Sequence, residues 1–447
     1  MKKTIKHFFI ACLLLSSSFS WAQSKPCKQV VGYYCDWITN TVDFSKYTVL
    51  NYAFVEPNPD GTIKAPAVPT TVLSNMVTQA HANGVKALVS VGGWTWSNNF
   101  PTIAKTDAAR KKFASECQRY ITTYGLDGID IDWEYPGYAD HGGTTSDKVN
   151  NTLLFQEIRN AIGANKLLTA CYGIAPDRMT NIEWSKLVPI IDMFNLMTYD
   201  CFGAWDATTN HNSPLYAPSQ GAASLNVSAA FKAVVNTYGV PSTKVNIGIA
   251  FYGHSFLGAT ALFGSHTGAD NAWNDGSPVY SSIMAQKSTF TEKWDDVAKV
   301  PYLLGNNKFV SYDNEQSVNL KGKFAAANNA CGAIVWELSG DRIGATNPLA
   351  AALNAGLCNG SVGVDDLPAQ PNAVLYPNPA TEAVQVSIQN GYLDNVVTVY
   401  NALGQVVISK QYNQFIFTID LNGLEKGIYL VNISNEGGVM SEKIVKE

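Results

Sequence analysis

The chain has few charged residues and no excess of basic ones. Of its 447 residues, 15% are Asp, Glu, Lys or Arg, the formal net charge is −5 and the isoelectric point is near 5.7. Without a basic excess there is no electrostatic reason to expect nucleic acid or an anionic membrane as a partner. The hydrophobic share of 46% and the length predict a large buried core and more than one domain.

Several motifs of metal and nucleophilic chemistry are missing. The six histidines form no HExxH pair, the cysteines form no CxxC pair, and there is no GxSxG serine motif. Acids at 130, 132 and 134 have the spacing of a calcium loop, but Tyr135 occupies the position where an EF-hand requires glycine. We therefore expect neither a metal nor a cofactor.

Long apolar runs are also lacking, and the one near the start is too short to span a bilayer. This run, Phe8–Leu15, follows three lysines and precedes a small-x-small site that ends at Ala22. The order predicts a signal peptide over residues 1–22 and a soluble exported chain without stable membrane insertion. Acylation at Cys12 is a weaker alternative, because few apolar residues precede it.

Loss of that segment would leave seven cysteines, an odd number, so at least one thiol would be free or intermolecular. Export permits disulfides, but the spacing assigns no pairing. Buried apolar cysteines are an equally good interpretation for most of them.

Short apolar runs rich in strand-forming residues alternate with amphipathic stretches. We expect strands at Val30–Tyr34, Val49–Phe54, Lys86–Val91, Gly128–Asp132, Leu167–Tyr172, Asp192–Met197, Val245–Phe251 and Gly332–Trp336. We expect helices at Thr70–Ala82, Thr102–Tyr124, Asp147–Ile162, Leu225–Tyr238, Gln316–Asn328 and Pro348–Asn354. This order predicts an α/β fold, and eight strands in one unit favour a (β/α)8 TIM barrel over an open sheet.

The last part of the chain has a different pattern. Gly360–Asn372 contains Gly, Asp and Pro without periodicity and is expected to be a linker. Short strands are then expected at Val384–Ile388, Val396–Tyr400, Gln405–Ser409, Phe415–Ile419, Ile428–Ile433 and Glu442–Val445. Residues 373–447 are therefore predicted to form an all-β sandwich domain.

Three acids lie close together in the predicted fourth strand. Asp130, Asp132 and Glu134 occupy alternate positions, so their side chains share one face, with steps of about 7 Å along the strand. Burial of three carboxylates costs several kcal/mol unless they are paired, hydrogen-bonded or protonated. The cluster therefore predicts catalytic chemistry.

The octet Asp127–Glu134 resembles the DxxDxDxE signature of glycoside hydrolase family 18, the chitinase family. The resemblance covers about residues 28–357 and implies a barrel over 23–359 with its active site at the carboxyl ends of the strands. It also implies that the substrate's own 2-acetamido oxygen is the nucleophile, with retention of configuration.

The resemblance and the positions of the acids suggest a role for each of them. Glu134 would protonate the leaving oxygen and then act as base for water, which requires a raised pKa. Asp132 would orient the acetamide N–H, and Asp130 would share a proton with Asp132. Asp127 is expected to support the entry of the strand.

Further motifs resemble the same family. Met197-Thr198-Tyr199-Asp200 resembles its MxYD motif, which implies that Tyr199 donates to the acetamide oxygen and that Asp200 contacts the sugar, with Met197 beside them. Ser90–Trp94 resembles its SxGG motif, where glycines permit close backbone approach. Trp336 matches the tryptophan that forms the floor of the cleavage subsite.

The remaining binding candidates are aromatic. Trp94 and Trp205 are candidate stacking platforms, and Tyr33 and Tyr252 are expected either to line the cleft or to lie in the core. His254 stands where many relatives have arginine, so its contact with substrate is in doubt.

Roughly 80 residues separate the seventh and eighth strands, which is too many for one crossover helix and its loops. The segment 255–314 is rich in Gly, Ser, Tyr and Trp. It resembles the small α+β insertion that forms a wall of the substrate groove in some family members. A long irregular loop is the alternative.

The motifs Leu375–Ala380, Tyr400–Gln405, Lys426–Leu430 and Lys443–Lys446 together resemble a type IX secretion C-terminal sorting domain. The resemblance implies export across the outer membrane of a Gram-negative cell, with the type IX machinery as partner and a final location outside the cell or on its surface. A generic adhesive or carbohydrate-binding sandwich is the alternative.

Together these features predict a secreted chitinase, expected to be monomeric, that hydrolyses β-1,4-linked N-acetylglucosamine polymers and binds chitin or chito-oligosaccharides. An endo-β-N-acetylglucosaminidase acting on N-glycan chitobiose cores is an alternative enzyme. A non-catalytic chitin-binding lectin is an alternative from another class, disfavoured because the glutamate at 134 is present.

Overall fold

The structure is a computed structural model that describes residues 26–37, 42–66, 70–359, 373–388, 395–435 and 438–447. The predicted signal peptide over 1–22 and the predicted linker over 360–372 lie outside the described residues. Within the described ranges, none of the helices combines the length and apolarity that a bilayer crossing requires.

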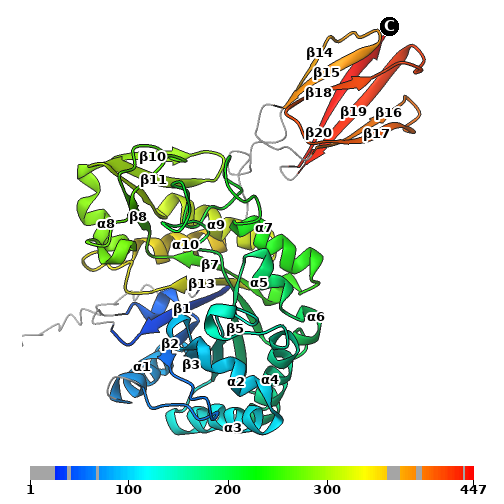
Figure 1. Cartoon of the computed structure of the whole chain (residues 1–447). Helices are drawn as coiled ribbons and strands as arrows, with labels where there is room; N and C mark the ends of the chain where they lie inside the picture. Colours follow the sequence, from blue (N-terminus) through cyan, green and yellow to red (C-terminus); the bar gives the residue numbers. More distant parts are fainter. Residues whose placement is uncertain (1–25, 38–41, 67–69, 360–372, 389–394, 436–437) are drawn as a thin grey trace, which may run out of the picture.

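Eight parallel strands close into a barrel, which confirms the predicted TIM fold (Figure 1). Around the barrel their order is β1-β13-β7-β6-β5-β4-β3-β2. Their bounds are β1 Gln29–Cys35, β2 Val49–Val55, β3 Lys86–Gly92, β4 Gly128–Asp132, β5 Leu167–Gly173, β6 Met193–Met197, β7 Val245–Ala250 and β13 Gly332–Trp336. Most strand residues are buried on both faces, which explains why the sequence shows nearly continuous apolar runs instead of alternation.

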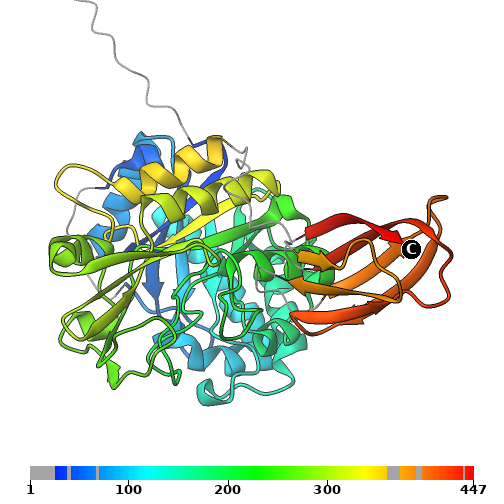
Figure 2. The same cartoon turned by 90° about the horizontal axis from the view of Figure 1, so that it is seen from above.

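Helices surround the strands (Figure 2). Their bounds are α1 Thr70–Ala82, α2 Phe100–Lys105, α3 Asp107–Tyr124, α4 Asp147–Ile162, α5 Pro176–Thr180, α6 Trp184–Leu187, α7 Val227–Lys232, α9 Glu315–Ala327 and α10 Pro348–Cys358. The predicted helix Thr102–Tyr124 is divided because Thr106 is extended and its hydroxyl caps α3 by accepting from the Ala109 N–H. The predicted helix Leu225–Tyr238 is a short α7 that continues into a π-helical turn at Ala233–Thr237.

A small α+β unit lies between β7 and β13. This confirms the predicted insertion and excludes the alternative, a long irregular loop. It contains a five-stranded antiparallel sheet in the order β10-β11-β12-β8-β9. The elements are β8 His254–Leu257, β9 Gly268–Ala269, α8 Tyr280–Gln286, β10 Thr291–Asp295, β11 Val300–Gly305 and β12 Lys308–Ser311. The unit is tied to the barrel domain by His211 Nε2, 2.9 Å from Asp295 Oδ2, and by Lys321 Nζ, 2.6 Å from Asp313 Oδ2.

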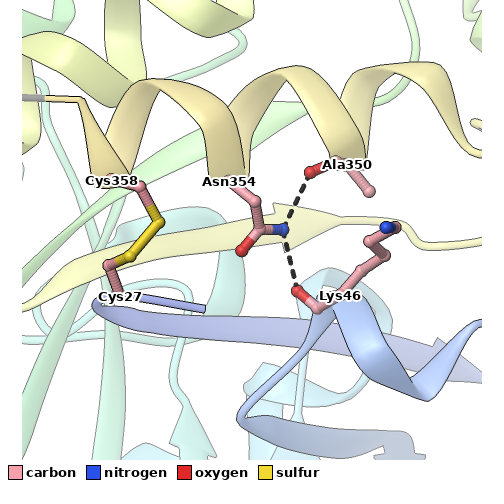
Figure 3. Close-up of a disulfide and its surroundings, with 5 residues drawn as sticks. All are labelled: Cys27, Lys46, Ala350, Asn354 and Cys358. Atoms are coloured by element: carbon pink, nitrogen blue, oxygen red, sulfur yellow. Dashed lines mark hydrogen bonds between the residues drawn. A yellow bond between two sulfur atoms is a disulfide. The ribbon is translucent and has the colours of Figure 1, made fainter. Parts of the chain in front are cut away.

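One disulfide, which the sequence could not assign, joins Cys27 ahead of β1 to Cys358 at the end of α10 (Figure 3). Beside it, the Asn354 amide donates to the backbone oxygens of Lys46 and Ala350, at 3.1 and 2.8 Å. The first and last parts of the barrel domain are therefore fastened together at its amino-terminal face. The other cysteines of the described residues are free thiols, namely Cys35, Cys117, Cys171, Cys201 and Cys331.

The C-terminal part is an all-β unit of two antiparallel sheets, as predicted. One sheet contains β14 Ala373–Tyr376, β15 Ala383–Ile388 and β18 Ile416–Asp420. The other contains β17 Val406–Tyr412, β16 Asn395–Tyr400, β19 Gly427–Asn435 and β20 Gly438–Lys446. The unit has its own hydrophobic cluster, separate from that of the barrel. β14 is a four-residue strand followed closely by two prolines, and the sequence pattern does not predict it.

Candidate active site

A cavity of about 910 Å³ opens at the carboxyl ends of the barrel strands. Seven of the eight strands contribute a residue at or next to that end, as expected for the functional face of this fold. The lining residues include Tyr33, Asp36, Trp37, Phe54, Gly92, Trp94, Trp96, Asp132, Glu134, Tyr135, Tyr138, Cys171, Gly173, Arg178, Met197, Tyr199, Asp200, Trp205 and Trp336.

Asp130 lies beneath this cavity, fully buried in the barrel. Its carboxylate accepts from Ser90 Oγ at 2.7 Å, the Tyr33 hydroxyl at 3.0 Å, Asn195 Nδ2 at 3.3 Å and the Thr169 hydroxyl. Burial raises the pKa of Asp130, and these hydrogen bonds limit the rise because they stabilise the anion. Four hydroxyl or amide donors from four strands, together with the Cys171 thiol at 3.9 Å, therefore compensate this buried charge.

Asp132 is also buried, at 4% exposure, but has a very different environment. Its Oδ1 has no hydrogen-bond partner among the described residues. Burial, followed by the neighbouring charges of Glu134 and Asp130, raises the pKa of Asp132 well above the ordinary value. Of the two buried aspartates, Asp132 is therefore the one that more readily holds a proton.

Glu134 follows β4 and lines the cavity, half-buried. Burial raises the pKa of Glu134 to about 7, the charge of Asp200 adds to the rise, and hydrogen bonds from Tyr135 and the Trp94 backbone oppose it. The Glu134 backbone N–H donates to Ser97 Oγ at 2.8 Å, which fixes the chain at this point. A carboxylic acid that keeps its proton near neutrality therefore faces the cavity.

Asp127 lies apart from the other three acids. Its Oδ2 accepts from the Ala87 N–H at 2.8 Å and lies 2.9 Å from His81 Nε2, at the amino-terminal end of β4. The residue joins α1 and β3 to the start of β4 and does not line the cavity.

The last residue of β6 and the residues after it form another wall. Met197 and Tyr199 line the cavity and are 9% and 8% exposed. Burial, with added effects from Cys171 and Asp132, raises the pKa of the Tyr199 hydroxyl well above the ordinary value. Tyr199 therefore remains a hydrogen-bond donor in the physiological pH range.

Asp200 connects this wall to the insertion. Its Oδ1 accepts from the Tyr252 hydroxyl at 2.6 Å and lies 2.9 Å from His254 Nε2. Ser277 Oγ lies 3.3 Å from the other ring nitrogen of His254. Neither Tyr252 nor His254 is among the residues that line the cavity. Both side chains therefore contact the Asp200 carboxylate without lining the cavity themselves.

Aromatic side chains make up much of the cavity surface. Trp336 packs between Tyr33 and Phe54, with ring centroids 5.6 and 5.5 Å away. Trp94 and Trp205 are 55% and 65% exposed, so more than half of the surface of each residue is accessible to a ligand. The sequence did not decide whether Tyr33 lines the cleft or lies in the core. Its side chain does both, because it lines the cavity and its hydroxyl donates to the buried Asp130.

Some residues that line the cavity are not indicated by the sequence motifs. Trp37, 59% exposed, lies just past β1, and its position after a strand end could have marked it. Tyr138 lies in the loop after β4 and Arg178 in α5, and the guanidinium carbon lies 4.1 Å from the ring centroid. No motif indicates these two residues, because their proximity depends on how the segments after β4 and β5 fold.

The glycines of the Ser90–Trp94 motif allow two strands to approach closely. Gly92 has φ of 110°, and a Cβ there would lie 2.2 Å from the backbone oxygen of Asp132. The Gly93 N–H donates to that same oxygen at 2.8 Å. Only glycine fits at position 92, so the motif fixes β3 against the acid-bearing strand.

Comparison with known proteins identifies the family. Residues 29–341 match the family described as glycosyl hydrolases family 18, and the chain belongs to that family. Residues 374–447 match the secretion system C-terminal sorting domain. Both resemblances seen in the sequence are thereby confirmed.

Among curated relatives, Chitinase A1 of Niallia circulans is 33% identical over 435 residues, which cover 76% of this chain and 61% of the relative. Chitinase 1 of Aphanocladium album is 32% identical over 274 residues, which cover 58% of this chain and 63% of the relative. The chain thus spans about three fifths of the length of these relatives.

Among solved structures, Group IV chitinase of Ostrinia furnacalis in complex with allosamidin has a TM-score of 0.71 at 29% identity, covering 75% of this chain and 100% of that one. A family 18 N-acetylglucosaminidase from Paenibacillus barengoltzii has a TM-score of 0.66 at 29% identity, covering 74% and 99%.

Proposed function

We propose that this protein is a chitinase that hydrolyses β-1,4 links between N-acetylglucosamine units with retention of configuration. The observation that carries the proposal is Glu134, a carboxylic acid with a pKa raised to about 7, facing the cavity beside the buried Asp132. Relatives named chitinases, at about one third identity, support the same substrate class.

The proposed reaction uses one protein acid and a nucleophile from the substrate. Glu134 donates its proton to the glycosidic oxygen, while the 2-acetamido oxygen attacks the anomeric carbon and the glycosidic bond breaks. The product of this step is a cyclic oxazolinium ion. Glu134, now a carboxylate, then removes a proton from water. The water oxygen attacks the anomeric carbon from the face that the leaving group occupied and opens the oxazolinium ring, so the configuration is retained.

Two neighbours hold the acetamide group. Asp132 accepts the acetamide N–H and stabilises the positive charge that develops on the ring. Tyr199 donates its hydroxyl to the acetamide oxygen, which its raised pKa allows because the hydroxyl stays protonated. Asp130 supports Asp132 from below, and shared protonation of the two remains part of this proposal.

The aromatic surfaces fit a chain of sugar rings. Trp336 forms the floor beneath the reacting sugar, with Met197 beside it. The exposed rings of Trp94 and Trp205 provide faces for stacking on the sugars on either side, and Asp200 offers a carboxylate to a sugar hydroxyl.

A product analysis tests this function. The protein is incubated with chitin oligosaccharides and, separately, with a chitobiose-core glycopeptide, and the initial anomers of the products are identified. We expect β-anomers from the oligosaccharides and no cleavage of the glycopeptide. Initial α-anomers would exclude acetamide participation, and preferential cleavage of the glycopeptide would favour the endo-β-N-acetylglucosaminidase alternative.

We further propose that the sorting domain directs the protein through the type IX machinery of a Gram-negative cell to the cell surface or the medium. The match over residues 374–447 supports this, and the Cys27–Cys358 disulfide fits an oxidising compartment. Deletion of residues 375–447 should retain active enzyme in the cell envelope. Unchanged amounts of enzyme in the medium, measured by activity and immunoblot, would contradict the sorting role.

A further inference from the structure

His141 lies beside the proposed acid but takes no part in the proposed steps. It ends a 3-10 turn, Ala139–His141, in the segment that joins β4 to α4, and it is not among the residues that line the cavity. Its Nδ1 lies 2.5 Å from the backbone oxygen of Glu134. Because a carbonyl oxygen can only accept, Nδ1 carries the hydrogen and donates it. The imidazole therefore holds the backbone of the acid.

The same imidazole packs against Trp94, an exposed ring of the cavity. The two ring centroids are 4.6 Å apart, and the ring planes are tilted by 59°. The Tyr138 ring contacts both, with its centroid 5.9 Å from that of Trp94 and 5.2 Å from that of His141. His141 and Tyr138 thus support the indole, while Trp94 itself lines the cavity.

A second connection joins the same two residues through the backbone. Ser97 is fully buried, and its Oγ accepts from the Glu134 N–H at 2.8 Å. The same Oγ donates to the backbone oxygen of Gly93 at 2.9 Å, with that of Asp132 at 3.2 Å. The N–H of the acid is thus tied to the residue before Trp94, and its carbonyl is tied through His141 to the Trp94 ring.

The loop that carries His141 is held by a buried acid. Asp147, 1% exposed at the start of α4, accepts from the Gly137 N–H at 3.0 Å and from the Thr144 N–H at 2.9 Å. The His141 N–H donates to the backbone oxygen of Tyr138 at 3.1 Å. Because these bonds fix the loop within the protein itself, the imidazole is in place before any ligand binds.

We propose that His141 is a positioning residue that couples the proposed acid to the Trp94 ring. Through Nδ1 it fixes the backbone of Glu134, and thereby the direction from which the carboxyl group approaches the glycosidic oxygen. Through its ring it fixes the plane of Trp94, and thereby the sugar that stacks there. The catalytic consequence rests on the proposed function, whereas the two contacts do not.

Two substitutions separate the two contacts. His141→Asn keeps an N–H donor near the position of Nδ1 and has no ring, whereas His141→Phe keeps a ring and has no donor. On chitin oligosaccharides we expect KM to rise about three- to ten-fold in His141→Asn with kcat nearly unchanged, the size of one lost aromatic contact. In His141→Phe we expect kcat to fall about three- to ten-fold with KM nearly unchanged, the size of one lost hydrogen bond. His141→Ala should show both changes.

His81→Ala is the matched control, because His81 also contacts an acid, Asp127, but does so at the other end of β4. It should leave KM and kcat unchanged. Identical kinetic changes in His141→Asn and His141→Phe would show that the residue acts only through the fold of its loop, and would overturn the coupling. Unchanged kinetics in His141→Ala would overturn it as well.

Fluorescence quenching tests the ring contact without turnover. The emission of Trp94 is obtained as the difference between each protein and its Trp94→Phe counterpart. Loss of the imidazole uncovers part of the indole, so acrylamide should quench this emission more strongly in His141→Ala and His141→Asn than in the wild type. In His141→Phe the quenching should match that of the wild type. Equal quenching in all four proteins would refute the inference, whereas an enzyme inactive on chitin whose Trp94 responds as expected would refute only the proposed function.

Discussion

At the scale of single residues, the chemistry of the site depends on how deeply each of three acids is buried and on how many hydrogen bonds its carboxylate accepts. Asp130 accepts from four hydroxyl or amide donors and from the Cys171 thiol, Asp132 Oδ1 has no partner among the described residues, and Glu134 faces the cavity. Asp130 and Asp132 lie on the same strand but differ in proton affinity, because hydrogen bonding and desolvation differ between the two positions.

Replacement of the proposed acid tests this distribution. Glu134→Gln keeps the shape of the side chain but has no proton to donate, so we expect turnover of chitin oligosaccharides to fall about 100- to 10,000-fold. Binding of the oligosaccharide, measured by calorimetry, should persist. Asp296→Asn, on an 86% exposed side chain of the insertion, is the control. Turnover near that of the control would exclude Glu134 as the acid.

The raised pKa of Glu134 also predicts pH dependence. Because the acid must be protonated, kcat/KM should decline as the pH rises through about 7. The stability of the fold also decreases as the pH rises. The folded state binds this proton more tightly than the unfolded state, so the contribution of Glu134 to the free energy of unfolding is lost as the pH rises towards 7. The Tm of the wild type should therefore fall relative to that of Glu134→Gln as the pH rises from about 5 to about 8. A constant difference would contradict the assignment.

The alternation of the acids along β4 predicted which side chains share a face. It did not predict Thr169, Asn195 or Cys171, which approach Asp130 from β5 and β6. Their proximity depends on the register between neighbouring strands, and the local sequence of each strand contains no signal for that register.

At the scale of elements, the insertion contributes to the site through a side chain that does not line the cavity. His254 begins β8 and holds the Asp200 carboxylate, which lies past the end of β6. The sequence placed the insertion correctly but left His254 in doubt, because a contact across two units depends on how they pack.

Removal of this contact should affect binding more than chemistry. In His254→Ala we expect KM for chitin oligosaccharides to rise about three- to ten-fold with kcat nearly unchanged, because Asp200 keeps only its bond from Tyr252. His266→Ala serves as the control, since His266 lies in the same unit and bonds the Asp206 backbone instead. A fall in kcat alone would place His254 in the chemical step.

Helix boundaries show where local patterns are insufficient. Residues 102–124 have an apolar periodicity that continues across Thr106, so a single helix was predicted. The structure breaks it there, because the threonine hydroxyl satisfies an N–H at the start of α3. The capping signal was present but was weaker than the periodicity around it.

At the scale of the whole molecule, the described residues have a large hydrophobic cluster in the barrel domain, a small one in the insertion and a separate one in the C-terminal unit, and one disulfide closes the barrel domain. The barrel follows from the repeated strand and helix pattern, so its class could be predicted. The pairing of Cys27 with Cys358 could not, because residues 331 positions apart meet only when the barrel closes.

Removal of that bond should lower stability and leave activity intact. In a Cys27→Ser and Cys358→Ser double variant we expect the free energy of unfolding of the barrel to fall by about 2–5 kcal/mol. The bond lies at the amino-terminal face and the cavity at the other, so kcat should not change. Cys331→Ser, an unpaired cysteine close to β1, is the control for urea unfolding. Equal stability of the two variants would show that the bond contributes nothing.

With that bond formed, the backbone from 27 to 358 is a covalent ring. A protease that cuts one exposed loop within the ring opens it without releasing a fragment, so the nicked molecule stays in one piece until a reductant is added. Trimming of residues beyond 358 leaves the ring closed. A single cut within the ring would thus leave the eight barrel strands covalently tethered.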